Sequence, residues 1–372
     1  DGMEDGALGL GSSLIYAPAF YASTEELVAL AEVVGEYGGM YISHLRSEGN
    51  RLLEAIDELI HIAREAGVAG EIYHLKVAGQ SNWDKFDAVV TTVEAAQAEG
   101  LAITADIYTY TAGSTGLDAA MPPWVQEGGY DAWSQRLQNP AIRDKVLSEM
   151  TVPTDEWENL GLAAGAEGTL LVGFRNPELR RYLGMTLAEV AAERETSAAD
   201  TVIDLVIEDG SRVQVVYFLM SEENVARGIA LPWVSFASDA RSMTTAGSFI
   251  EQSTHPRAYG NFARVLGKYV REEQIISLPE AIRKLSKLPA SNLKIRDRGE
   301  LRESYFADIV IFDPAEIQDH ATFDDPHQYA TGMAYVIVNG DIVIDKGEHT
   351  GALPGQVVRG PGWRGWKDSD TN

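Results

Sequence analysis

Short apolar runs alternate with amphipathic helical patterns along most of the chain. The runs stand at 7–10, 40–43, 71–73, 101–105, 213–218 and 233–237. After the first run, Ser23 and Glu26 have the spacing of a capping box, and the apolar residues that follow recur every three or four positions. Strands that alternate with helices in this way are typical of βα units, so the pattern predicts an α/β protein built on a parallel sheet.

The pattern changes near residue 304, where short β-rich pieces replace the helices. Apolar runs at 307–312, 334–338 and 342–344 predict strands, and Asn339-Gly340 between the last two predicts a tight hairpin. We therefore expect a barrel-type part (1–303), β-sandwich strands (304–348) and a C-terminal tail (349–372). Within the first part, the stretch around 113–176 is rich in Trp, Pro and charge and is expected to form an inserted lid.

The number of predicted strands is too small for a closed barrel. A (β/α)8 barrel has eight parallel strands, whereas six apolar runs precede the change of pattern. The C-terminal strands are likewise too few for an independent sandwich. Both shortfalls predict a (β/α)8 TIM-type barrel that is incomplete at its N-terminus, followed by the C-terminal part of a small β-sandwich.

Charge and the lack of cysteine narrow the classes of partner and of chemistry. The 372 residues include 30 Lys and Arg against 56 Asp and Glu, a formal net charge of −26. This balance argues against nucleic acid or an anionic membrane surface as partner, because both attract basic surfaces. No apolar run approaches the roughly 20 residues that span a bilayer. Without cysteine, any metal must bind His, Asp or Glu. The compartment stays open between cytoplasm and periplasm, and the oligomeric state is open too, a homo-oligomer included.

Polar residues follow five of the predicted strands, at the ends where parallel barrels carry their active sites. They are His44-Leu45-Arg46, His74-Leu75-Lys76, Asp106 with Tyr108, Ser221-Glu222-Glu223 and Ser238-Asp239. Imidazole and carboxylate ligands suit Zn²⁺, which lowers the pKa of a bound water to about 7 and polarises a carbonyl group. This constellation predicts a hydrolytic metal site.

Several of these segments also carry a family resemblance. In order along the chain they are Gly6-Ala7-Leu8-Gly9-Leu10 with Tyr16-Ala17-Pro18, Tyr41-Ile42-Ser43-His44-Leu45-Arg46-Ser47-Glu48, Tyr73-His74-Leu75-Lys76, Asp106-Ile107-Tyr108-Thr109-Tyr110-Thr111-Ala112, Ser238-Asp239-Ala240 and His255-Pro256-Arg257-Ala258-Tyr259-Gly260. Together they resemble the N-acyl-D-amino-acid deacylases (D-aminoacylases) over nearly the whole chain. The ending, from Asp297-Arg298-Gly299 to Val338-Asn339-Gly340, resembles the point where the amidohydrolase superfamily returns from its barrel to its small β-sandwich.

The resemblance implies a zinc hydrolase that cleaves the acyl amide of a small-molecule N-acyl-D-amino acid. His74 matches the metal-binding histidine at the end of barrel strand five. Asp239 matches the strand-eight aspartate that activates the water and protonates the amine. Arg257 matches the arginine that grips the substrate carboxylate, a role that suits the bidentate guanidinium fork.

Four more positions complete the expected site. Arg46 and Lys76 are expected to add to the cationic patch that binds the substrate. Tyr108 stands where some members place a second metal histidine; a phenol is a poor zinc ligand at neutral pH, so we place Tyr108 among the substrate-binding residues. His44 lies at a strand end as His74 does, and is equally compatible with lining the site and with a structural hydrogen bond.

Two alternatives stay open. A cyclic-amide hydrolase of the dihydroorotase or hydantoinase type shares the fold and the strand-eight aspartate. With His74 as the one ligand assigned, we expect the 372-residue chain by itself to bind zinc weakly or not at all and to show little catalysis. A non-catalytic fragment that lacks a complete metal site is the other alternative, and it predicts weak zinc binding or none.

Overall fold

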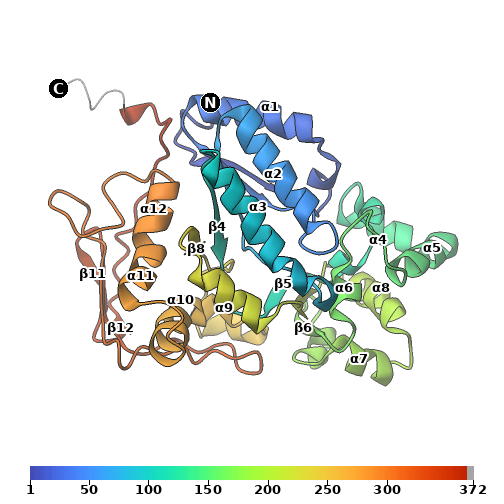
Figure 1. Ribbon diagram of the computed structural model, residues 1–372. Coiled ribbons are helices and arrows are strands. Elements are labelled where there is room, and N and C mark those ends of the chain that lie inside the picture. Colours follow the sequence, from blue (N-terminus) through green and yellow to red (C-terminus); the bar gives the residue numbers. More distant parts are fainter. Residues whose placement is uncertain (367–372) are drawn as a thin grey trace.

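The core of the molecule is a five-stranded parallel sheet, seen in a computed structural model that describes residues 1–366 (Figure 1). The strands pair in the order β1-β2-β3-β4-β8, each parallel to its neighbour. Their bounds are β1 (Gly9–Ser13), β2 (Met40–His44), β3 (Ala69–Ile72), β4 (Ile103–Ile107) and β8 (Val234–Phe236). Because the strands are parallel, their C-terminal ends meet at one edge, and that edge carries the site described below.

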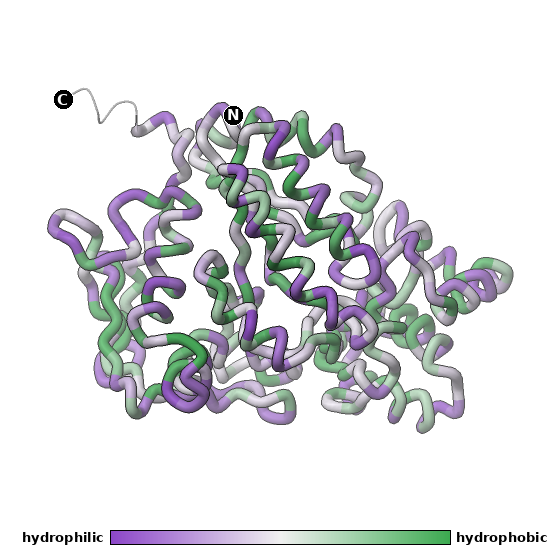
Figure 2. Tube along the Cα trace, in the orientation of Figure 1, coloured by the Kyte–Doolittle hydropathy of each residue, from purple (hydrophilic) through white to green (hydrophobic). Residues whose placement is uncertain are grey.

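Three helices connect the first four strands and lie side by side over the sheet (Figure 1). They are α1 (Thr24–Glu36), α2 (Leu52–Ala66) and α3 (Phe86–Ala98). The Ser23 side chain accepts a hydrogen bond from the Glu26 N–H and so caps α1, as its sequence predicts. Helix α2 ends where Gly67 adopts a positive φ of 63°. Hydrophobic and hydrophilic positions alternate along these helices in Figure 2, which reflects one buried and one exposed face.

Between β4 and β8 the chain leaves the parallel sheet and builds a second unit, which we call the insert (residues 112–218). It contains an antiparallel sheet in the order β5-β7-β6 and five α-helices. The bounds are β5 (Ala112–Gly116), α4 (Tyr130–Leu137), α5 (Pro140–Met150), α6 (Leu160–Ala164), β6 (Thr169–Gly173), α7 (Leu187–Glu193), α8 (Ala198–Asp209) and β7 (Gln214–Phe218).

The prediction that residues 213–218 belong to the parallel sheet is wrong. These residues form β7, which pairs antiparallel with both β5 and β6. The three central residues of β7 are all buried, so both faces of the strand are covered. Parallel strands that are covered on both faces have the same continuous apolar run, which is why the sequence pattern did not distinguish β7 from them. The described parallel sheet therefore has five strands, one fewer than the six that the apolar runs indicated.

Helices follow the last parallel strand before the chain enters a separate β-sheet. Helix α9 (Glu222–Ala230) leads into β8, and α10 (Arg257–Arg264), α11 (Leu278–Ile282) and α12 (Leu288–Asn292) come after it, with π-helical turns at Val265–Glu272 and Arg283–Lys287. The final sheet is antiparallel, in the order β12-β11-β10-β9. Its strands are β9 (Ile309–Phe312), β10 (Met333–Val338), β11 (Asp341–Asp345) and β12 (Glu348–His349). Asn339 and Gly340 join β10 to β11 with φ angles of 50° and 91°, so the predicted hairpin is confirmed.

An α/β fold with a small C-terminal β-sheet is thus confirmed. The closure of the parallel strands into a barrel and its N-terminal incompleteness stay predictions, as do the domain bounds 1–303, 113–176, 304–348 and 349–372. Residues 367–372 of the predicted tail lie outside the described residues. Within residues 1–366, no helix combines the length and the apolar character needed to cross a bilayer.

Candidate metal centre and substrate cleft

A cleft of about 1080 Å³ opens at the C-terminal edge of the parallel sheet. His44, His74, Asp106 and Asp239 line it from the ends of β2, β3, β4 and β8. The insert and the loop that follows β8 form the other walls, with side chains that include Phe174, Arg175, Arg212, Met243, Phe249 and Gln252. The cleft therefore lies between the strand ends, the insert and the loop after β8.

Two histidines meet at the bottom of this cleft. His44 ends β2 and His74 follows β3, and the neighbouring register of these strands brings the imidazoles to a centroid distance of 4.6 Å. His44 Nδ1 lies 3.0 Å from His74 Nε2. Both residues are buried, with 8% and 7% of their surface exposed. The His74 N–H donates to Asp106 Oδ1 at 2.9 Å, which fixes the backbone of His74 at its positive φ of 38°.

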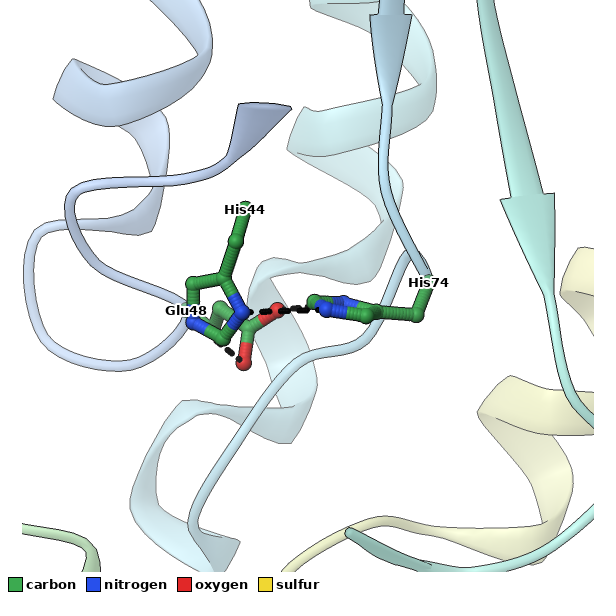
Figure 3. A group of neighbouring side chains, drawn as sticks. All are labelled: His44, Glu48 and His74. Atoms are coloured by element: carbon green, nitrogen blue, oxygen red, sulfur yellow. Dashed lines mark hydrogen bonds and ion pairs between the residues drawn. The ribbon is translucent and has the colours of Figure 1, made fainter. Parts of the chain in front are cut away.

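Glu48 and Lys76 complete a buried polar cluster around the two rings. Glu48 Oε1 lies 3.0 Å from His74 Nδ1 and 2.6 Å from Lys76 Nζ. Glu48 Oε2 lies 3.6 Å from His44 Nε2, a nitrogen that makes no hydrogen bond within residues 1–366. Figure 3 shows the Glu48 carboxylate beside both imidazoles, with His44 on one side and His74 on the other.

The charges in this cluster are set by burial and by one ion pair. Burial lowers the pKa of the His44 imidazole to about 3, although the nearby Glu48 carboxylate acts to raise it. Burial would raise the pKa of Glu48, but its contacts with the His44 imidazole, the Lys76 ammonium and the His74 imidazole outweigh burial and hold that pKa below its usual range. At neutral pH His44 is therefore neutral and Glu48 is ionised.

The residues present fit a zinc ion. Two nitrogens that bind the same tetrahedral zinc at about 2.05 Å are separated by roughly 3.3 Å, close to the 3.0 Å between His44 Nδ1 and His74 Nε2. A neutral imidazole, as burial makes His44, is the form that binds a metal. His44, Glu48 and His74 are also the one group of three or more His, Cys, Asp or Glu side chains within residues 1–366 that could hold an ion and whose candidate ligand atoms lie within 4.8 Å of one another.

A second cluster lies on the same cleft around Arg257, the first residue of α10. Arg257 Nη2 lies 2.8 Å from Asp239 Oδ2, and its guanidinium stacks 4.5 Å from the centre of the Tyr108 ring. The Arg257 side chain is only 4% exposed, yet its Nε and Nη1 have no hydrogen-bond partner within residues 1–366. Buried unpaired donors cost free energy, about 1–3 kcal/mol each, unless a ligand satisfies them. Tyr108 is also buried, and its ring lies 6.4 Å from that of His74.

Five of the six expected site residues lie close together. His74, Lys76, Asp239 and Arg257 line the cleft, and Tyr108 packs behind them against Arg257 and His74. Burial raises the pKa of the Tyr108 phenol, so its hydroxyl keeps its proton.

Arg46 lies elsewhere. It donates to both carboxylate oxygens of Glu58 at 2.8 and 2.9 Å and to the carbonyls of Phe20 and Ala22. It lines a second cleft, of about 700 Å³, rather than the cleft of the histidines. In a continuing strand, Arg46 would lie on the same face as His44, because side chains alternate between faces. Strand β2 ends at His44, so this alternation does not reach Arg46.

Sequence reasoning missed two members of the histidine cluster. It left the role of His44 open, although His44 ends a strand next to that of His74, and this shared placement was the available signal. Glu48 ends the family motif that begins at Tyr41, but it was given no role, because it lies in the loop after β2. Ser47 marks a turn there, since its Oγ accepts hydrogen bonds from the backbone N–H groups of Gly49 and Arg51, but this does not indicate that Glu48 faces His44.

Comparisons with known proteins agree with this arrangement. Residues 234–344 match the family model described as "Amidohydrolase family". A D-aminoacylase from Alcaligenes xylosoxydans xylosoxydans is 33% identical over 96% of this chain and 62% of its own length. A crystal structure of D-aminoacylase superposes with a TM-score of 0.76 at 31% identity, over 95% of this chain and 63% of that chain.

A third relative is the N-acyl-D-glutamate deacylase from Bordetella bronchiseptica, solved in complex with zinc and a phosphonate inhibitor. It has a TM-score of 0.76 at 28% identity and covers 96% of this chain and 64% of that chain. The present chain thus spans about three fifths of the length of the curated relatives that it matches. Over that span, the resemblance to the D-aminoacylase (N-acyl-D-amino-acid deacylase) family is confirmed, and residues 234–344 match the amidohydrolase family.

Proposed function

We propose that this chain carries the active site of a zinc-dependent hydrolase that cleaves the acyl amide of N-acyl-D-amino acids. One observation supports this most directly. A single cleft holds two facing imidazole nitrogens 3.0 Å apart and a buried guanidinium with two unpaired N–H groups. The two imidazole nitrogens suit a metal ion, and the guanidinium suits a carboxylate. A substrate that has both an amide bond and a carboxylate therefore fits the metal position and the guanidinium together.

His44 Nδ1 and His74 Nε2 are the atoms proposed to hold the metal. When bound there, zinc supplies a Lewis acid that polarises the amide carbonyl and makes water more acidic. His44 presents its lone pair because its imidazole is neutral. The relative that was solved with zinc supports the choice of ion.

Asp239 is proposed to move the proton. Its Oδ2 is held by Arg257 Nη2, and its side chain is 42% exposed on the cleft, which leaves Oδ1 free to face the substrate. A carboxylate in this position accepts a proton from the attacking water and returns it to the amine nitrogen as the C–N bond breaks. The acyl group then leaves as a carboxylate and the amine as the D-amino acid.

Arg257 is proposed to bind the substrate carboxylate through its unpaired Nε and Nη1. The Tyr108 ring beneath the guanidinium holds its plane, through a cation–π contact at 4.5 Å. Lys76 also lines the cleft, but its ammonium is already paired with Glu48. The donors of Arg46 are taken up by Glu58 and two carbonyls, so we leave Arg46 out of the proposed substrate site.

We also propose that the parallel strands are consecutive strands of a (β/α)8 barrel. Strands β1 to β4 pair in sequence order and helices connect them; the metal and proton-transfer candidates lie at the C-terminal ends of β2, β3 and β8. These are features of TIM-type barrel enzymes.

The test is a substrate panel with a metal measurement on the same samples. N-acetyl-D-amino acids, their L-enantiomers, hydantoin and dihydrouracil are incubated with the purified 372-residue chain before and after zinc loading. We expect zinc-dependent hydrolysis of the D-enantiomers, abolished by His74→Ala and Asp239→Asn. Hydrolysis of the cyclic amides alone would favour the hydantoinase type. Weak zinc binding or none, together with no hydrolysis of any compound, would favour the non-catalytic alternative.

A further inference from the structure

Three polar atoms form a tight triangle behind His74. Its Nδ1 lies 2.5 Å from Lys76 Nζ and 3.0 Å from Glu48 Oε1, and Lys76 Nζ lies 2.6 Å from the same Glu48 oxygen. All three side chains are at least nine-tenths buried, so bulk water does not replace a missing partner. The polar atoms of these three side chains that point into the triangle therefore depend on one another as hydrogen-bond partners.

The protons allow one arrangement when His74 faces a metal. If Nε2 offers its lone pair to the metal, the single proton of the neutral imidazole sits on Nδ1. The Lys76 ammonium also has only donors. The 2.5 Å contact from Lys76 Nζ is a hydrogen bond only while Nδ1 is the acceptor. Once Nδ1 carries the proton, both groups are donors, and the acceptor that contacts both of them is Glu48 Oε1. Without the negative charge of Glu48, an ammonium and an N–H would be opposed in a buried site.

The position of Glu48 separates this role from that of a metal ligand. The two ring nitrogens that approach each other are His44 Nδ1 and His74 Nε2. The oxygens of Glu48 instead lie beside the other two, His74 Nδ1 and His44 Nε2 (Figure 3). The two nitrogens of an imidazole point in diverging directions, so a carboxylate at these atoms lies behind the rings and not at the point where the rings converge.

We propose that Glu48 is a positioning residue, not a third metal ligand: it holds His74 with its proton on Nδ1 and its Nε2 turned to the metal, while Lys76 supplies the counter-charge. The inference rests on the proposed metal centre. Carboxylates that support a ligating histidine in this way typically change metal affinity by about 10–100-fold. Lys76 then serves the metal site through Glu48.

Zinc affinity in a double-mutant cycle tests the proposal. The 372-residue chain and its E48Q, K76M and E48Q/K76M variants are titrated with Zn²⁺ against a chromophoric chelator. We expect E48Q to weaken zinc binding about 10–100-fold, because the Lys76 ammonium loses its partner beside the metal. We expect E48Q/K76M to regain a large part of that loss, because no unpaired ammonium remains.

The matched control is E58Q, which removes another largely buried carboxylate that pairs with Arg46 and contacts neither histidine. E58Q should leave zinc affinity unchanged. If Glu48 is itself a ligand, E48Q/K76M will bind zinc no better than E48Q, and that result overturns the proposal. Unchanged affinity in E48Q overturns it as well.

The tautomer of His74 gives a readout that does not need metal. In chain labelled with ¹⁵N-histidine, long-range ¹H–¹⁵N spectra of the metal-free protein should show His74 protonated on Nδ1, with E48Q shifting it toward the Nε2–H form. The H74N variant identifies the signal. A His74 tautomer that E48Q leaves unchanged would overturn the inference even if zinc binds. Failure of the unsubstituted chain to bind zinc, with the expected tautomer shift, would instead count against the proposed function alone.

Discussion

Replacing Arg257 with lysine tests how the substrate is anchored. Arg257 offers two buried unpaired donors, Nε and Nη1, beside the one that holds Asp239. Lysine keeps the positive charge but not the planar fork, so a bidentate contact becomes a single one. A hydrogen bond to a charged group contributes about 1.5–3 kcal/mol, and 1.4 kcal/mol corresponds to a factor of ten. We therefore expect R257K to lower kcat/KM roughly 10- to 150-fold, mostly through KM.

The assay compares two substrates. One is an N-acetyl-D-amino acid, and the other is the matched N-acetyl amine, which has the same side chain but no carboxylate. R257K should lower kcat/KM for the first and leave the second nearly unchanged, because only the first has a group for the fork to bind. Equal losses for both substrates would refute the reasoning, since Arg257 would then act through Asp239 and not on the carboxylate.

Three further predictions concern residues away from the histidines. Arg46→Ala leaves the Glu58 carboxylate largely buried without its cation, so the free energy of unfolding in urea should fall by about 3–5 kcal/mol while KM stays constant; a raised KM would mean that Arg46 reaches the substrate. The Gln252 amide exchanges hydrogen bonds of 2.8 and 2.7 Å with the backbone of Phe174 and so ties the loop after β8 to the insert. Gln252→Ala should speed amide exchange in residues 240–254 and raise KM, and unchanged exchange would count against this tie. Burial lowers the pKa of Lys284 to about 8 in the folded chain, against a value near 10.5 in the unfolded chain. The contribution of Lys284 to the free energy of unfolding is therefore fully present above pH 10.5, where the amine is neutral in both states, and is lost as the pH falls through 8. The difference in unfolding free energy between the unsubstituted chain and Lys284→Met should change by about 3 kcal/mol across that window, and a constant difference would contradict it.

The positions of the strands were predictable from the sequence, but the sheet to which each belongs was not. β2 was expected at 40–43 and spans Met40–His44, because an apolar run closed by a turn is a local feature. β7 was expected in the parallel sheet and pairs with β5 and β6. Pairing partners depend on contacts distant in sequence, and β7 has the same buried run as a parallel strand.

The site shows the same division between local and distant information. Asp239 and Arg257 were identified separately, while their 2.8 Å contact depends on how the loop between them folds. His44, Arg46 and Glu48 lie within five residues, yet only His44 and Glu48 meet at His74, whereas Arg46 turns toward α2. The residue types indicated a metal-binding site, whereas the conformation of the turn after β2 determines which of these three residues lie at that site.

The charge of the whole molecule and the charge of its cleft have opposite signs, and this gives a prediction about ionic strength. The chain carries −26, but its cleft is lined by Lys76, Arg175, Arg212, Arg241 and Arg257 against Glu48, Asp106 and Asp239. Burial raises the pKa of Asp106 to about 8, helped by the nearby Glu71 carboxylate, so at neutral pH Asp106 adds no negative charge.

At about 0.01 M salt the Debye length is about 30 Å, and an anionic substrate senses the repulsion of the whole chain; at about 0.1 M it is about 10 Å, and the cations of the cleft dominate. For an N-acetyl-D-amino acid, kcat/KM should therefore rise between these salt concentrations and fall again above them as the cleft itself is screened. The uncharged N-acetyl amine should show neither change. A steady fall from the lowest salt concentration would contradict the prediction, because it would mean that the cleft governs the approach of the substrate at every distance.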